Sequence, residues 1–111
     1  MEVKTRQFKR VDVVEVSGRV DSATAPRLEE TLQAILGQGR FNIVVDMQGL
    51  EYLSSAGLRV LVAALKETRR WNRGDVRLSN VPERIKGVLN LAGLDALFSV
   101  YDATVDAVGS F

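Results

Sequence analysis

Residues 46–58 read DMQGLEYLSSAGL, and this stretch decides how the chain is organised. The apolar run at residues 41–47, which leads into it, is too short for a helix and too continuous for a half-exposed strand. It therefore predicts a strand buried on both faces. From Leu58 onward, apolar side chains recur three and four positions apart, the spacing of one helix face, up to about Trp71. The stretch thus predicts a short loop between a buried strand and an amphipathic helix.

Two neighbouring serines, Ser54 and Ser55, lie where this helix is expected to start. A hydroxyl in that position has an ordinary role, because it can accept a hydrogen bond from an unpaired backbone N–H of the first turn. Ala56 and Gly57 follow, and such small residues leave the Ser55 hydroxyl uncovered. A glycine costs a helix about 1 kcal/mol relative to alanine. We interpret Gly57 as room for the close approach of another molecule.

Three segments carry a family resemblance: Asp46, residues 53–58 (LSSAGL) and residues 18–21 (GRVD). With them, nearly the whole chain resembles the STAS domain, the fold of bacterial anti-sigma-factor antagonists. In that family a strand ending in Asp or Asn precedes an aromatic-apolar-Asp-Ser motif, and a partner kinase phosphorylates the serine after the Asp. The resemblance implies that Ser55 is the phosphoacceptor, and it places Ser54 where the family usually has Asp.

The resemblance also implies a partner and a surface that binds it. The partner is an anti-sigma factor of the serine-kinase type, which the unmodified chain would bind so that a sigma factor is released. Phosphorylation of Ser55 would weaken this binding. The implicated partner-binding residues are Asp21, Ser54, Ser55, Ala56, Gly57 and Leu58. Asp21 also has a simpler interpretation, as an acid that favours the positive end of the next helix.

The serine at position 54 leaves an alternative function open. The chain would then be a non-enzymatic STAS subunit of a larger assembly, such as a lipid-transport ABC complex, a transporter or a stressosome-like particle. Neither interpretation requires a cofactor, direct contact with nucleic acid or insertion into a membrane. The sequence does not decide whether the chain forms a homodimer, nor which sigma factor, kinase, phosphatase or stress signal is involved.

The composition restricts the chemistry that the chain can perform. A length of 111 residues predicts a single domain, residues 1–111, and a net charge of +1 creates no field that points to nucleic acid or an anionic membrane. The absence of cysteine and histidine excludes disulfides, thiolate nucleophiles, imidazole bases and the usual zinc sites. No phosphate-binding loop motif and no secretory signal are present. We therefore expect a cytoplasmic binding module without catalytic or metal-binding residues.

The rest of the chain alternates between strand and helix patterns. A first hairpin is followed by a helix that opens at Pro26 and turns Leu28, Leu32, Ile35 and Leu36 toward the core. The remaining expected elements are a strand at 76–78, a helix at 82–93, a strand at 97–101 and a short helix at 102–108. The predicted fold is α/β, a STAS-like mostly parallel sheet of four or five strands with an antiparallel first strand and about four helices.

Several residues are expected to mark bends or element ends. Gly18 predicts a bulge or a close backbone approach, and Gly74 predicts a left-handed stop after the basic helix end at residues 69–73 (RRWNR). This basic end is interpreted as a solvated helix terminus, where cations are favoured, because no second basic stripe extends it into a nucleic-acid footprint. The sequence also assigns Asn80 and Asp102 as helix caps.

The strand-end acids Asp21 and Asp46 admit one further arrangement, in which they pair across the edge of the sheet. Strand-end acids more often serve a helix start or lie in solvent.

Overall fold

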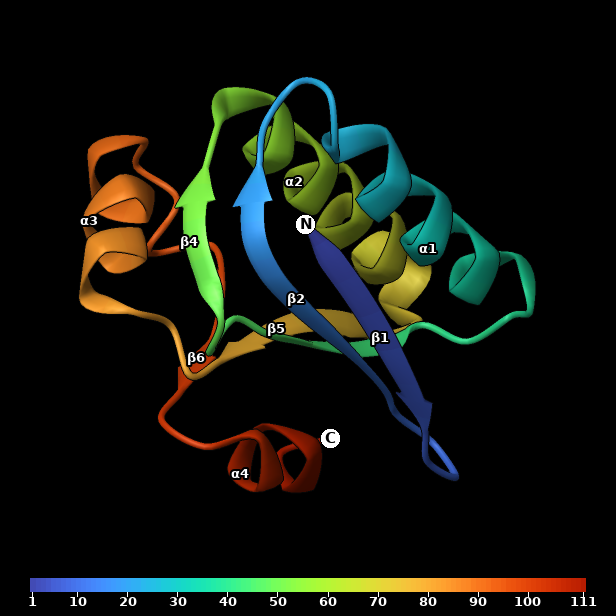
Figure 1. Ribbon diagram of the computed structural model, residues 1–111. Coiled ribbons are helices and arrows are strands. Elements are labelled where there is room, and N and C mark those ends of the chain that lie inside the picture. The colour runs from blue at the N-terminus through green and yellow to red at the C-terminus, as the bar shows by residue number, and fades with distance from the viewer.

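Six strands form one sheet, and four α-helices pack around it (Figure 1). The computed structural model describes residues 1–111. The strands are β1 (Glu2–Gln7), β2 (Asp12–Val20), β3 (Asn42–Asp46), β4 (Leu50–Leu53), β5 (Asp75–Ser79) and β6 (Val100–Tyr101). The helices are α1 (Ala25–Gly37), α2 (Ser55–Arg69), α3 (Glu83–Leu91) and α4 (Thr104–Gly109), and a 3₁₀ turn, η1, spans Arg70–Asn72.

The sheet is mostly parallel with an antiparallel first strand, which confirms the predicted fold class. The main path runs β1-β2-β3-β5-β6, where only β1 and β2 are antiparallel. The sheet has six strands rather than four or five, because β4 lies inside the stretch that the sequence predicts to be a loop. β4 has only four residues, with the two leucines at its ends buried and the middle two exposed, so it shows no clear strand or helix period.

Strand β2 has two parallel partners along its length. Its first residues pair with β3 and its last residues pair with β4, and the register shifts between Gly18 and Arg19. Gly18 has a φ of 81°, and a Cβ atom there would lie 3.3 Å from the Cα atom of Met1. The prediction for Gly18 is thus confirmed, and the irregularity marks the point where β2 exchanges β3 for β4.

The main core lies between the sheet and helices α1, α2 and α3. It contains 23 buried residues, among them Leu28, Leu32, Ile35 and Leu36 of α1, as predicted. The chain is buried continuously from 43 to 47, which confirms a β3 strand covered on both faces. A smaller cluster of four buried residues lies on the opposite side of the sheet, under α4. None of the helices has both the length and the apolar character needed to cross a bilayer.

The chain reversal after α2 differs from the prediction. The left-handed residues are Trp71, with a φ of 58°, and Asn72, with a φ of 56°, whereas Gly74 does not have a positive φ. Gly74 is required for a different reason, since a Cβ atom there would lie 2.1 Å from the carbonyl oxygen of Phe41. The predicted left-handed stop at Gly74 is therefore wrong, because the close approach of the Phe41 carbonyl, not the local turn, demands the glycine.

Two predicted helix caps and one strand length are also wrong. Asn80 has a φ of 51° and donates its side-chain N–H to Asp46 and Thr104, so it ties β5 to neighbouring segments and does not cap α3. The N-cap positions belong to Pro82 for α3 and Ala103 for α4, and neither helix has a side-chain cap. Strand β6 covers two residues of the expected five, because only these pair with β5.

Candidate functional site

Strand β4 determines where the two serines lie. It runs parallel to the end of β2, with Leu53 paired to Val20, and the Ser54 N–H donates to the Val20 carbonyl at 2.9 Å. In Figure 1 the ends of β2 and β4 lie side by side at one edge of the sheet, and each leads into a helix. The loop that begins at Asp21 therefore lies beside the start of α2, as the resemblance implies.

Ser54 and Ser55 have different local environments. Ser54 is the N-cap of α2, where its Oγ accepts the Gly57 N–H at 3.3 Å and its carbonyl accepts the Leu58 N–H at 3.0 Å. Ser55 is the first helical residue and is exposed, and its hydroxyl makes no hydrogen bond with the rest of the protein. The ordinary capping role thus belongs to Ser54 alone, and the Ser55 hydroxyl is exposed without a partner in the protein.

Gly57 is buried, which contradicts the interpretation that it leaves room for another molecule. A Cβ atom at this position would lie 2.6 Å from the Leu53 Cδ1 atom and 2.7 Å from the Val20 Cγ1 atom. The close approach is internal, because the first turn of α2 packs directly on the ends of β2 and β4. Its neighbours Ala56 and Leu58 are half-buried and pack against the main core. Gly57 positions the serines and presents no surface of its own.

Asp21 organises the adjacent loop. Its Oδ1 atom accepts the backbone N–H groups of Ala23, at 3.0 Å, and Thr24, at 3.1 Å, just before α1 begins. The Thr24 bond is the main reason why the pKa of Asp21 lies below its ordinary value of 3.8. The Ala23 bond, the Thr24 hydroxyl and the positive charge of Arg19 lower this pKa further, while partial desolvation opposes them. The carboxylate therefore remains charged and keeps the loop in one conformation.

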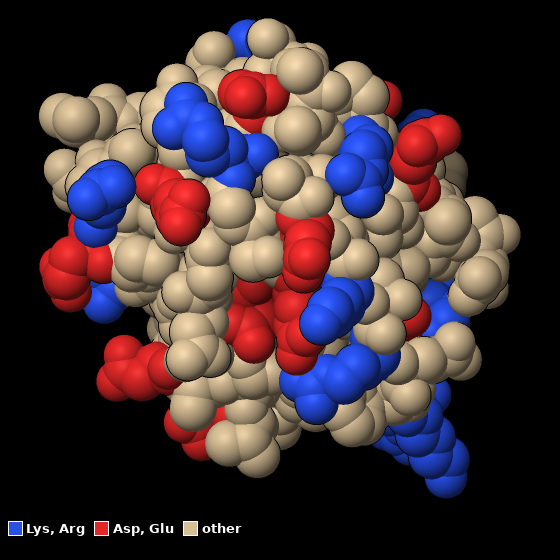
Figure 2. Space-filling model, viewed as in Figure 1, with Lys and Arg blue, Asp and Glu red and all other residues tan.

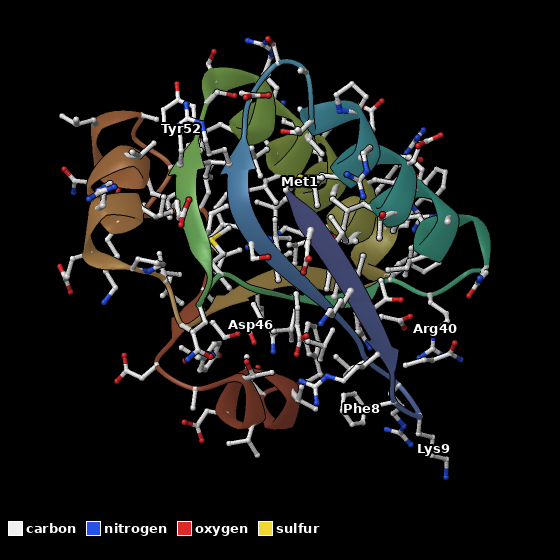
Figure 3. All side chains as sticks on the ribbon, in the orientation of Figure 1. Met1, Phe8, Lys9, Arg40, Asp46 and Tyr52 are labelled. Carbon is white, nitrogen blue, oxygen red and sulfur yellow. The ribbon has the colours of Figure 1, made fainter.

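Arg19 and Tyr52 join this surface, although the sequence analysis did not single them out. They are register partners on β2 and β4, and the Arg19 guanidinium lies 4.3 Å from the centroid of the Tyr52 ring. The Tyr52 side chain is 40% exposed, and Figure 3 shows it at the end of β4, beside the start of α2. No sequence period pairs these residues, because the register shift after Gly18 brings them together.

Asp46 lies at the other end of this region, as the labels in Figure 3 show. Its Oδ1 atom accepts the Gln48 N–H at 3.1 Å and a side-chain N–H of Asn80 at 3.2 Å. In the sheet it pairs with Glu15 of β2, and Asp21 follows the end of β2 about 20 Å farther along the chain at the usual rise per residue. The acid pair considered from the sequence does not form, and Asp46 has a structural role at the end of β3.

Comparison with known proteins identifies the family. Residues 2–107 match the family model of the STAS domain. The chain belongs to the STAS domain family. The BtrV protein of Bordetella bronchiseptica, named as a candidate anti-sigma factor antagonist, is 32% identical over 96 residues, which cover 86% of this STAS domain and 82% of the relative. The anti-sigma-B factor antagonist of Staphylococcus aureus is 29% identical over 104 residues, which cover 94% and 95% of the two chains.

A solved structure supports the same assignment. An anti-sigma factor antagonist from Mycobacterium paratuberculosis matches this STAS domain with a TM-score of 0.83 and 29% sequence identity, and the match covers 98% of this chain and 92% of the other. The family resemblance and the fold class inferred from the sequence are both confirmed.

Proposed function

We propose that this STAS domain is an anti-sigma-factor antagonist that binds a serine-kinase-type anti-sigma factor and is switched off by phosphorylation of Ser55. Relatives that align with most of the chain carry the name of this class. The observation that supports the proposal most directly is that the two serine hydroxyls have different environments. Ser54 is occupied as the cap of α2, whereas Ser55 offers an exposed hydroxyl without an internal partner.

The proposed docking surface surrounds that hydroxyl. Ala56 and Leu58 supply small and apolar area on α2, and Tyr52 adds a ring that is 40% exposed. Asp21 holds the neighbouring loop through backbone hydrogen bonds, so the surface is formed before a partner arrives. A preformed surface suits a protein that must bind quickly once it is dephosphorylated, because no segment has to be ordered first.

The switch is electrostatic and local. A phosphate on Ser55 adds about −1.5 to −2 charges at neutral pH. At the first position of α2 this charge faces the unpaired N–H groups and the positive end of the helix dipole, which favour it. The modification therefore leaves the fold intact, while a hydrated anion beside Ala56 and Leu58 opposes burial of that surface against a partner.

Serine at position 54 preserves the geometry of this switch. Serine and aspartate are both good N-cap residues, so either one can accept the Gly57 N–H in the same way. The difference is one negative charge next to the acceptor. We therefore infer that Ser54 alters how strongly the kinase recognises the loop, and that it does not remove the acceptor.

Incubation with the cognate kinase and ATP, followed by mass spectrometry, tests the proposal. Ser55→Ala should abolish phosphorylation, whereas the control Ser54→Ala should retain it. Ser54→Asp, which introduces the usual family residue, should keep or improve phosphorylation. Phosphate found only on Ser54 would show that the assigned acceptor is wrong.

Partner binding provides the second arm of the test. Ser55→Glu should weaken the complex with the anti-sigma factor by about tenfold, because it places a charge on a surface that must be desolvated, and Ser55→Ala should bind like the wild type. If a confirmed partner kinase modifies neither serine, the constitutive subunit of a larger assembly becomes the better description.

A further inference from the structure

The proposed switch uses only the N-terminal end of α2. At a rise of 1.5 Å per residue, the other end of this helix lies about 20 Å away, and there the chain reads RRWNR over residues 69–73. From the sequence this segment is a solvated helix terminus, but in the structure its first two residues, Arg69 and Arg70, line a groove.

The groove has a volume of about 360 Å³ and lies between the C-terminal half of α2 and the segment before β6. Three of its six lining residues are apolar and three are cationic, and no acidic side chain lines it; we call the apolar part of the lining the floor and the cationic part the rim. The floor residues are Val62, Leu65 and Leu97, and the rim residues are Lys66, Arg69 and Arg70. The pocket on the face shown in Figure 2 differs, because three acids and one lysine contribute to its lining.

Arg69 holds the two walls of the groove together. Its Nε atom donates to the Asp75 carboxylate at 2.8 Å, and its Nη2 atom donates to the Leu97 carbonyl at 2.7 Å. This arginine is therefore already used by the fold. Lys66 and Arg70 form no ion pair, so two cations on the rim are available to a ligand.

Trp71 extends this surface beyond the groove. Its side chain is 75% exposed, and the guanidinium groups of Arg70 and Arg73 lie 4.4 Å and 5.4 Å from the ring centroid. Trp71 and Asn72 both adopt left-handed backbone conformations, which are unfavourable for residues that carry a Cβ atom. Strain of this kind persists only where the surrounding structure imposes it, and it is concentrated at functional segments.

We propose that this groove, together with Trp71, is a second docking site, which binds an acidic peptide segment of a partner protein. An apolar side chain of the peptide would occupy the floor, and flanking carboxylates would meet Lys66 and Arg70. The charge of the rim argues for this occupant, because a desolvated rim cation needs an anionic group opposite it. Trp71 and the arginines are the residue types that most often dominate such interfaces.

The apolar floor favours a peptide over a single-stranded nucleic acid. Nucleic-acid grooves follow the phosphate backbone with a continuous track of cations, whereas half of the residues that line this groove are apolar. The face shown in Figure 2 is a poorer match for the rim when it is offered by a second copy of this chain, since its acids are interspersed with lysine and arginine.

Selection from a random peptide library tests the proposal with the full chain. Peptides enriched on the wild type should combine Asp or Glu with Leu or Phe. Trp71 is the only tryptophan, so its fluorescence reports directly on binding at this end of α2. Titration with an enriched peptide should shift or quench the emission in a saturable way.

Matched variants locate the binding site. Arg70→Glu should raise the Kd of the enriched peptide by about tenfold or more, because attraction at the rim becomes repulsion. Arg84→Glu makes the same charge change at an exposed position on α3 outside the groove, and it should change the Kd by less than about twofold. Leu97→Gln should also weaken binding, since it alters the floor and keeps the backbone carbonyl that Arg69 binds. Circular dichroism must show that each variant is folded.

Four results would overturn the proposal. These are a selection that enriches no peptide, enrichment of basic or uncharged peptides, unchanged Trp71 emission, and equal affinity of the acidic peptide for Arg70→Glu. If oligothymidylate changes the Trp71 emission at lower concentration than the peptide in the same salt, the groove is a nucleic-acid site instead.

Discussion

The two ends of α2 contrast in how their backbone groups are satisfied. At the N-terminal end, Ser54 caps the helix from an extended backbone conformation, and the buried Gly57 lets the first turn pack closely on the strands. At the C-terminal end, two left-handed residues reverse the chain, and long side chains satisfy the last carbonyl groups. Arg73, for example, donates to the carbonyls of Glu67 and Arg70 at 2.6 and 3.1 Å.

This difference shows how one helix can present two unlike surfaces. The N-terminal end is small, unstrained and complementary to a negative charge, which agrees with the proposed phosphorylation of Ser55. The C-terminal end is cationic and aromatic, and its arginines also complement the negative end of the helix dipole. A continuous buried stripe of α2 residues joins the ends and keeps them at a constant separation.

The largest expected effect concerns the close packing at the N-terminal end of α2. Gly57→Val should lower the free energy of unfolding by about 3 kcal/mol, because the new side chain overlaps Leu53 and Val20. Gly87→Val in α3 is the control, since nothing lies within 4 Å of a Cβ atom there, and it should change stability by less than about 0.5 kcal/mol. Urea unfolding measures both. A Gly57→Val variant as stable as Gly87→Val would show that packing against the strands does not explain Gly57.

An intermediate effect on stability is expected at the two serines, and it tests which of them caps α2. Ser54→Ala should cost about 1 kcal/mol in the free energy of unfolding, because the Gly57 N–H loses its acceptor. Ser55→Ala should stay within about 0.5 kcal/mol of the wild type, since its hydroxyl has no internal partner and alanine is a good helix former. A greater loss for Ser55→Ala than for Ser54→Ala would reverse the assignment of cap and acceptor.

The smallest expected effect tests the strain at the C-terminal end. Asn72→Gly should raise the free energy of unfolding by about 0.5 kcal/mol, because glycine relieves the left-handed conformation but loses more chain entropy on folding. Asn72→Ala should lower it by about 0.5–1 kcal/mol, since alanine tolerates this conformation less well than asparagine. Thermal unfolding of the pair measures the contrast. Shifts of the same sign would mean that the reversal after α2 is not strained.

The sequence predicted the features that depend on local patterns. The continuous apolar run at 41–47 identified the buried strand β3. The helical spacing of Leu28, Leu32, Ile35 and Leu36 identified the core face of α1. Both predictions succeeded because the pattern of apolar residues that are close in sequence shows which side chains face the core. The family motif also assigns the phosphoacceptor to Ser55 and not to Ser54, by counting along the chain, and this assignment stays a prediction.

The features that depend on distant neighbours were not predictable in this way. The short strand β4 is recognisable only because β2 lies beside it. Gly57 and Gly74 are required because atoms of other segments, Val20 and Leu53 in one case and Phe41 in the other, approach them closely. Asn80 resembles a cap in the sequence, but its side chain is used by Asp46 and Thr104.

What the sequence determined by itself is therefore the alternation of strands and helices, the identity of the buried faces and the family to which the motif belongs. The tertiary structure decided which serine serves as the helix cap, that Asp46 pairs with Glu15 and is separated from Asp21, and that a basic helix end borders a partly apolar groove. The physical reason is that hydrophobic period is a property of neighbouring residues, whereas strand register and close packing join residues that are far apart in the chain.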